Sequence, residues 1–169
     1  MENQIYDSYP KSIVLISTLF TLTTYLLGVF ILAGFGLWLV VLYVLYCIWL
    51  EFRLLQKSCV NCYYYGQSCG QGRGVICAWF FKQGKNENFN STSFSWLNVL
   101  PDFLVTLIPL LLGIIALIIN FSWLILLALA ALIILATAGN ALIRGKYLCP
   151  HCRQRELGCP AEQLFSSSK

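Results

Sequence analysis

The sequence has few charged residues. Asp, Glu, Lys and Arg together make up 11% of its 169 residues, and 59% of the residues are hydrophobic. A soluble globular domain carries about 25% charged residues. The shortage is too large to reflect only an unusually apolar core. The composition therefore argues against the soluble globular class and favours a membrane protein.

Two long stretches, 12–50 and 103–143, contain no charged residue at all. Each is about twice the roughly 20 residues that a helix needs to cross the hydrocarbon core. A turn signal lies near the middle of each run, at 34–36 and at 120–122. Neither run alternates as a barrel strand does. We therefore expect an all-α integral membrane fold with four transmembrane helices, at about 12–33, 37–56, 98–119 and 122–144.

The two hairpin turns between these helices contain no basic residue. With four spans, all eleven basic residues fall on the opposite side: Lys11, Arg53, Lys57, Arg73, Lys82, Lys85, Arg144, Lys146, Arg153, Arg155 and Lys169. Lysine and arginine are retained in the cytoplasm during insertion. We therefore expect both termini to be cytoplasmic, with the chain in the plasma (inner) membrane. We expect four parts in chain order. They are an amino-terminal segment with the first transmembrane hairpin (1–56), a cysteine-rich loop (57–97), the second transmembrane hairpin (98–144) and a cysteine-rich tail (145–169).

Chemistry outside the cysteines is scarce. The sequence has one histidine and no catalytic acid–base pair, and its charge-free runs hold no ionisable group of the kind that marks an ion pathway. The glycine-rich stretch at 70–74 lacks the lysine of a phosphate-binding loop, and we interpret it as a flexible turn. Whether the protein is an enzyme stays open at this level. The expected partners are the lipid bilayer and a redox or membrane-complex partner, with no nucleic acid.

The eight cysteines follow a repeated pattern. Each predicted hairpin is followed by Cys-x2-Cys-x6-Cys, and the offset between the two copies is 90 residues at all three positions: Cys59, Cys62 and Cys69, then Cys149, Cys152 and Cys159. The pattern predicts two parallel helical-hairpin repeats, related by an axis along the membrane normal. Both segments would then meet with Cys77 in a small cytoplasmic cap. Cys47, inside the second helix, is interpreted as a packing residue.

The spacing of these cysteines indicates a metal site. Two Cys-x2-Cys turns supply the four soft ligands of a zinc or rubredoxin-like iron site, and Cys59, Cys62, Cys149 and Cys152 fit that pattern. Such a site would staple the loop to the tail. The other candidate ligands are Cys69, Cys77, His151 and Cys159. Alternatively, each copy binds its own iron–sulfur cluster, with Cys77 as fourth ligand in the first. The sequence does not distinguish zinc from an iron–sulfur cluster.

Three functions are compatible with this pattern. The first is an electron-transfer or scaffold subunit with a cysteine-ligated metal. The second is a membrane thiol–disulfide oxidoreductase, because Cys149-Pro150-His151-Cys152 resembles the active-site tetrapeptide of the DsbA oxidoreductases. That resemblance implies a first cysteine of low pKa. The third is a protein that passes copper, mercury or zinc ions between thiols.

The loop of about 40 residues is too small to fold without a metal, a disulfide or a partner. Its second part, from Phe80 to Trp96, mixes aromatic residues with lysine and asparagine. This composition is typical of a segment that lies at the level of the lipid headgroups.

Overall fold

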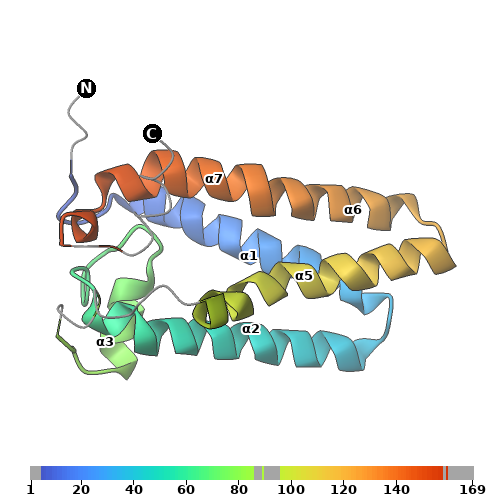
Figure 1. Ribbon diagram of the computed structural model, residues 1–169, viewed down its shortest axis with the longest axis horizontal. Helices are drawn as coiled ribbons and strands as arrows, with labels where there is room; N and C mark the ends of the chain where they lie inside the picture. The colour runs from blue at the N-terminus through green and yellow to red at the C-terminus, as the bar shows by residue number, and fades with distance from the viewer. Residues whose placement is uncertain (1–4, 86–88, 90–95, 158, 160–169) are drawn as a thin grey trace. The chain divides into compact units, whose positions relative to one another are not determined.

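The computed structural model describes residues 5–85, 89, 96–157 and 159. Over these residues the structure is helical, and the only β-type pairing described is a single bridge between Tyr6 and Cys152. Four candidate spans are long and apolar enough to cross a membrane: Lys11–Ala33, Leu37–Asn61, Leu100–Ile119 and Trp123–His151 (Figure 1). The expectation of an all-α membrane protein with four spans is confirmed at this level.

The helix boundaries follow the sequence expectation closely except at the fourth helix. The first three long helices are α1 (Lys11–Ala33), α2 (Leu37–Lys57) and α5 (Trp96–Ile119). The fourth starts as α6 (Trp123–Ile134). It then continues through a π-helical stretch, α7 (Asn140–Leu142) and a second π-helical stretch that ends at Leu148. The fourth helix extends beyond the charge-free run because no proline interrupts it before Pro150.

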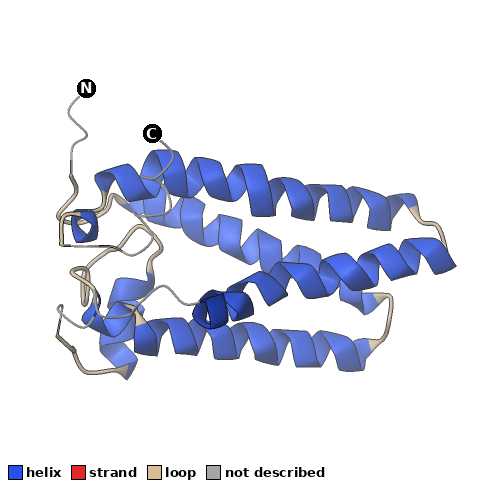
Figure 2. Ribbon diagram, in the orientation of Figure 1, coloured by secondary structure: helices blue, strands red, loops and turns tan. Residues whose placement is uncertain are grey.

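The chain divides into two compact units. The first, here called the cap unit, comprises residues 1–19, 52–95 and 141–169, and the second, the helical unit, comprises 20–51 and 96–140. The cap unit holds most of the loops and short helical turns together with the start of α1 and the ends of α2 and the fourth helix, and the helical unit holds the rest of the long helices. Figure 2 shows the helices and loops of the chain. Of the eight cysteines only Cys47 belongs to the helical unit, so the other seven all lie in the cap unit.

The helical unit is built from two helical hairpins. Gly36 closes the α1–α2 turn with a φ of 117°, which only glycine adopts readily. The second turn, between α5 and α6, lies at the same end of this unit (Figure 1). One cluster of buried residues joins α1, α2 and α5: Leu32, Tyr43, Cys47, Leu50 and Val105. A second joins α1 and α6: Ile31, Ala128, Leu129 and Leu132. Cys47 is buried here, as expected for a packing residue.

A proline in α5 is compensated by a tyrosine from α2. Pro109 lacks the N–H that would bond the carbonyl of Val105 one turn earlier. The Tyr43 hydroxyl donates to that carbonyl oxygen at 3.0 Å. An unpaired carbonyl costs several kcal/mol in lipid, so this bond lets a proline-containing helix cross the membrane. Gly28 of α1 makes room for the same ring, because a Cβ there would overlap it.

A short helix that the sequence interpretation did not include lies in the loop. This helix, α3 (Arg73–Phe80), follows Gly72, whose φ of 73° is again suited to glycine. Its first turn carries Gly74, which packs against the backbone of Tyr64 and Gln67. The glycine-rich stretch is thus an ordered helix start as well as a turn. Much of the expected interfacial segment, at 86–88 and 90–95, lies outside the described residues.

Candidate functional site

Each Cys-x2-Cys pair forms a 3₁₀ turn at the end of a long helix. The first turn, Cys59–Asn61, follows α2, and the second, Cys149–His151, follows the fourth helix. In both turns the N–H of the second cysteine donates to the carbonyl of the first at 3.3 Å. The second cysteines, Cys62 and Cys152, have similar backbone angles, with φ of −81° and −86° and ψ of 149° and 120°. The two turns therefore present their thiols from nearly the same local backbone.

The second cysteine of each turn also receives the same backbone hydrogen bond. The N–H of Tyr64 donates to the sulfur of Cys62, and the N–H of Gln154 donates to the sulfur of Cys152. Each donor stands two residues after its cysteine. A hydrogen bond to a sulfur favours its anionic form, which is the form that binds metals. Burial raises the pKa of both thiols, and these hydrogen bonds offset part of that rise.

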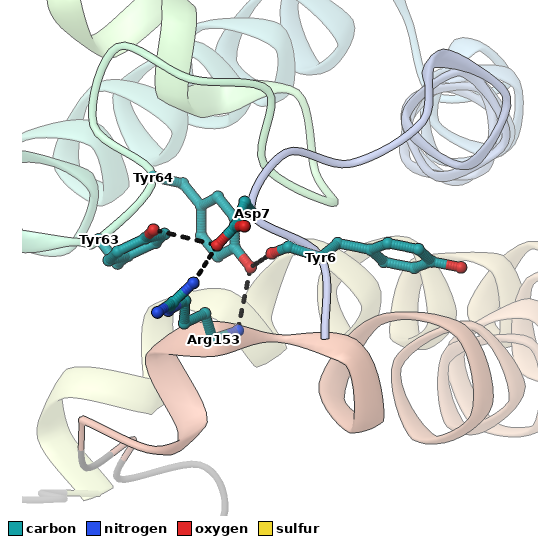
Figure 3. Close-up of polar contacts among 5 residues, drawn as sticks. All are labelled: Tyr6, Asp7, Tyr63, Tyr64 and Arg153. Atoms are coloured by element: carbon teal, nitrogen blue, oxygen red, sulfur yellow. Dashed lines mark hydrogen bonds and ion pairs between the residues drawn. The ribbon is translucent and has the colours of Figure 1, made fainter. Parts of the chain in front are cut away.

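The loop and the tail contact each other through reciprocal hydrogen bonds. The N–H of Tyr63 donates to Oε1 of Gln154 at 2.7 Å, and the N–H of Arg153 donates to Oη of Tyr64 at 2.9 Å (Figure 3). Arg153 and Gln154 stand 90 residues after Tyr63 and Tyr64. If each loop residue is exchanged for the tail residue 90 positions later, one of these hydrogen bonds becomes the other. Such an exchange is the mark of an isologous, two-fold contact.

The amino-terminal segment ties both cysteine segments together. Tyr6 donates its N–H to the carbonyl of His151 at 3.1 Å, and its own carbonyl accepts from the Tyr64 hydroxyl at 2.6 Å. Tyr9 donates its N–H to Ser68 of the loop and its hydroxyl to the Leu148 carbonyl at 2.7 Å. Tyr9, Tyr64 and Leu148 form the buried core of the cap unit. Burial, followed by the charge of Cys152, raises the pKa of Tyr9, so its hydroxyl remains a donor.

An ion pair adds to this connection at the surface. Asp7 accepts from the guanidinium of Arg153 and, at 3.3 Å, from the hydroxyl of Tyr63 (Figure 3). The Arg153 guanidinium also lies 5.4 Å from the centroid of the Tyr63 ring. Because the pair is exposed to solvent, it contributes little to stability. The buried hydrogen bonds of Tyr64 and Tyr9 contribute more to holding the cap unit together.

The cysteines of the loop surround the start of α3. Cys69 accepts a hydrogen bond from the N–H of Gly74 at 3.3 Å, and Cys77, fully buried, donates to the Leu55 carbonyl at 3.6 Å. The turn Cys59–Asn61 packs against α3. The loop therefore brings together the segments that carry Cys59, Cys62, Cys69 and Cys77.

The thiols of the tail continue this group. Cys62 of the loop and Cys152 of the tail both pack against the buried cluster of Tyr9, Tyr64 and Leu148. Burial is the main reason that the pKa of Cys62 rises to about 11, and burial also raises the pKa of Cys152. Cys62 and Cys152 thus form the junction between the two segments. All eight cysteines of the chain are free thiols.

His151 occupies a place beside the amino-terminal segment. Its ring lies against that of Tyr6, with 5.1 Å between centroids. Among the described residues, no three cysteine, histidine or acidic side chains lie close enough together to hold a metal ion. The seven candidate cysteines and His151 thus all lie in the cap unit, although no three of them form a metal-holding group in the described part of the chain.

Sequence reasoning missed the tyrosines and the glutamine that bring the two segments together. The signal was faint: tyrosines at 6, 9 and 63–65 flank the cysteines, and buried tyrosines commonly carry a hydroxyl bond. Gln154 is 2% exposed, which is rare for glutamine unless it is hydrogen-bonded. Comparison of the chain with protein-family models, curated proteins and solved structures finds no match.

Proposed function

We propose that this membrane protein binds zinc or an iron–sulfur cluster through cysteine thiolates of the cap unit, and acts as an electron-transfer or scaffold subunit. The observation that carries the proposal is the gathering of seven thiols, from segments about 90 residues apart, into one compact unit. Soft thiolates are the ligands that zinc and iron–sulfur clusters prefer. We further propose that the two segments are copies of one repeat, which their reciprocal hydrogen bonds support.

The first ligand set we favour lies within the loop. Cys59, Cys62, Cys69 and Cys77 all belong to this loop, and α3, which carries Cys77, packs against the turn Cys59–Asn61. These four thiols match the arrangement in which each copy binds its own metal, rather than a staple made of Cys59, Cys62, Cys149 and Cys152. Because the thiols stand apart in the described part of the chain, binding must draw the loop closed around the metal. Metal binding and ordering of the loop are then coupled.

Gln154 fits an anionic centre at the junction. Its Nε2 is buried and has no hydrogen-bond partner in the described part of the chain. An unsatisfied buried donor costs about 1–3 kcal/mol. A thiolate or a cluster sulfide carries the negative charge that such a donor can bond. Donors of this kind tune metal sites from beyond the ligands themselves.

The test is the metal content of the full-length protein, purified without oxygen from cells supplied with zinc and iron. A visible absorption band with bound iron supports a cluster, and a colourless protein with stoichiometric zinc supports a structural site. Cys59→Ser or Cys77→Ser should remove most of the metal, since a hydroxyl is a poor substitute for a thiolate. Cys47→Ser, in the helical unit, is the matched control. Metal-free protein with all eight thiols free would refute the proposal.

The same variants separate the two metal arrangements. If the loop binds its own metal, Cys149→Ser and Cys152→Ser leave that metal in place. If the four Cys-x2-Cys thiols form one staple, either variant loses it together with Cys59→Ser.

A thiol–disulfide oxidoreductase is the second candidate. The observation that favours it is that the Cys152 thiol has Cys149 and Cys159 in its own segment and Cys62 across the junction as neighbours. A disulfide between Cys149 and Cys152 could exchange with the thiol of Cys159 or with that of Cys62. Mass spectrometry of the alkylated, metal-free protein distinguishes this candidate. A reducible Cys149–Cys152 bond supports exchange chemistry over a metal site.

A further inference from the structure

The short helix α3 has two different faces. Gly74 and Cys77 are buried, and Cys77 contacts the end of α2 through the Leu55 carbonyl. The remaining apolar side chains point outward: Val75, Ile76, Trp79 and Phe80. Their spacing puts them on one side of the helix. Trp79 is 79% exposed and Phe80 is 60% exposed, so this side of α3 is an uncovered apolar surface.

This surface continues the outward face of a transmembrane helix. The Phe80 ring meets the ring of Phe52 edge-on, with 5.6 Å between centroids. Phe52 lies near the end of α2, inside the candidate span Leu37–Asn61. On α2 itself, Leu45, Ile48, Trp49 and Phe52 are all exposed and follow the helical period. In a membrane-spanning helix such an apolar stripe faces lipid, and α3 extends it through the Phe52–Phe80 contact.

Basic residues flank the same surface. Arg73 begins α3, and Lys82 and Lys85, both exposed, follow its end. Basic side chains near a membrane surface are attracted to anionic lipid headgroups. Tryptophan, in turn, is enriched at the level of those headgroups. The apolar face and its basic flanks together match an interfacial helix, which lies with its apolar side about 5–10 Å into the headgroup and acyl boundary.

We propose that α3 lies in the headgroup layer of the bilayer, with Val75, Ile76, Trp79 and Phe80 in contact with lipid. The occupant of this face is the bilayer rather than a second copy of the chain, because the face adjoins Phe52, an exposed residue inside the candidate span Leu37–Asn61. The opposite face of α3 carries Cys77, so the lipid contact holds the thiols of the loop at the membrane surface. This placement does not depend on whether those thiols bind a metal.

The experiment measures the depth of Trp79 in the full-length protein. Trp38, Trp49, Trp96 and Trp123 are replaced by phenylalanine, and the protein is reconstituted into phosphatidylcholine–phosphatidylglycerol vesicles. The lipids carry bromine either near the headgroup or near the methyl end of the acyl chain. A matched chain carries its one tryptophan at position 42 of α2 (Leu42→Trp), an exposed position ten residues, or about 15 Å, along the helix from Phe52. Bromine near the headgroup should quench Trp79 more strongly, and bromine near the methyl end should quench the tryptophan at position 42 more strongly.

Three results would overturn the proposal. Free quenching of Trp79 by aqueous acrylamide without quenching by either lipid would place α3 in water. Protection from acrylamide and from both lipids would mean that protein, such as a second copy, covers the face. Quenching in the order seen for the tryptophan at position 42 would place α3 in the hydrocarbon core. If the single-tryptophan chain does not fold, the otherwise native chain is compared with its Trp79→Phe variant. The difference between their emission spectra is the emission of Trp79, and its quenching by the two lipids is then measured.

Discussion

Tyr64 and Gln154 hold the two cysteine segments together with one side chain each. The Tyr64 hydroxyl accepts from Arg153 of the tail and donates to Tyr6 of the amino-terminal segment. The Gln154 carbonyl oxygen accepts from Tyr63 of the loop. Both side chains are 2% exposed. Because buried donors and acceptors are costly to leave unpaired, these few atoms specify how the loop meets the tail.

Replacing Tyr64 with phenylalanine should therefore loosen the cap unit. The variant leaves the Arg153 N–H and the Tyr6 carbonyl without their partner, which we expect to cost about 1–3 kcal/mol. Hydrogen-exchange mass spectrometry should show faster exchange in the tail around Arg153. Tyr65→Phe is the matched control, because that hydroxyl bonds the Phe81 carbonyl within the loop. Equal exchange in the tail of both variants would contradict the role given to Tyr64.

At the scale of the element, small residues and tyrosine hydroxyls decide how the helices pack. Hydrophobic burial does not drive helices together in lipid, so close packing and hydrogen bonds must do so. Gly28 gives the Tyr43 ring its place against α1, and Gly113 similarly gives room to Leu129 and Ile31. The hydroxyls of Tyr43 and Tyr46 each bond a carbonyl of α5. These contacts join the two hairpins of the helical unit.

Gly28→Ala should weaken this packing. The added methyl overlaps the Tyr43 ring, and overpacking of this kind costs about 1–3 kcal/mol. The variant should lose helical structure at a lower concentration of sodium dodecyl sulfate, measured by circular dichroism. Gly34→Ala serves as the control, because its methyl would meet only the Ile31 carbonyl at an ordinary 3.7 Å. A midpoint for Gly28→Ala equal to that of Gly34→Ala would show that α1 and α2 do not need this close approach.

At the scale of the whole molecule, the distribution of basic residues argues for one orientation. Four spans place all eleven lysines and arginines on the side that carries the termini and the loop. Because lysine and arginine are retained in the cytoplasm during insertion, this distribution predicts that the cap unit faces the cytoplasm. The cytoplasm is a reducing compartment, in which cysteines stay as thiols.

A reporter enzyme that is active only outside the cytoplasm tests this orientation. Fused to the carboxyl terminus it should be inactive, and inserted in the turn at 120–122 it should be active. The two fusions control each other for expression and folding of the reporter. Activity at the carboxyl terminus, with none in the turn, would place the cysteines outside the cytoplasm and favour disulfide chemistry.

The sequence by itself determined the membrane class, the four helices and their ends to within a few residues. The reason is that lipid leaves a helix few options. Charge-free runs of 39 and 41 residues, each broken by one turn signal, match two helical hairpins and little else. The spacing of the cysteines likewise pointed to the residues that the cap unit gathers.

Only the tertiary structure decided what joins these parts. The contact between Tyr63 and Gln154 spans 91 positions, and that between Tyr9 and Leu148 spans 139. Such contacts leave no periodic trace in the sequence, because each depends on a single side chain meeting a distant backbone group. The helix α3 was equally hidden, since its eight residues are too few to show a period and depend on packing against the loop and α2. Local pattern determined the helices, and long-range hydrogen bonding determined the cap unit.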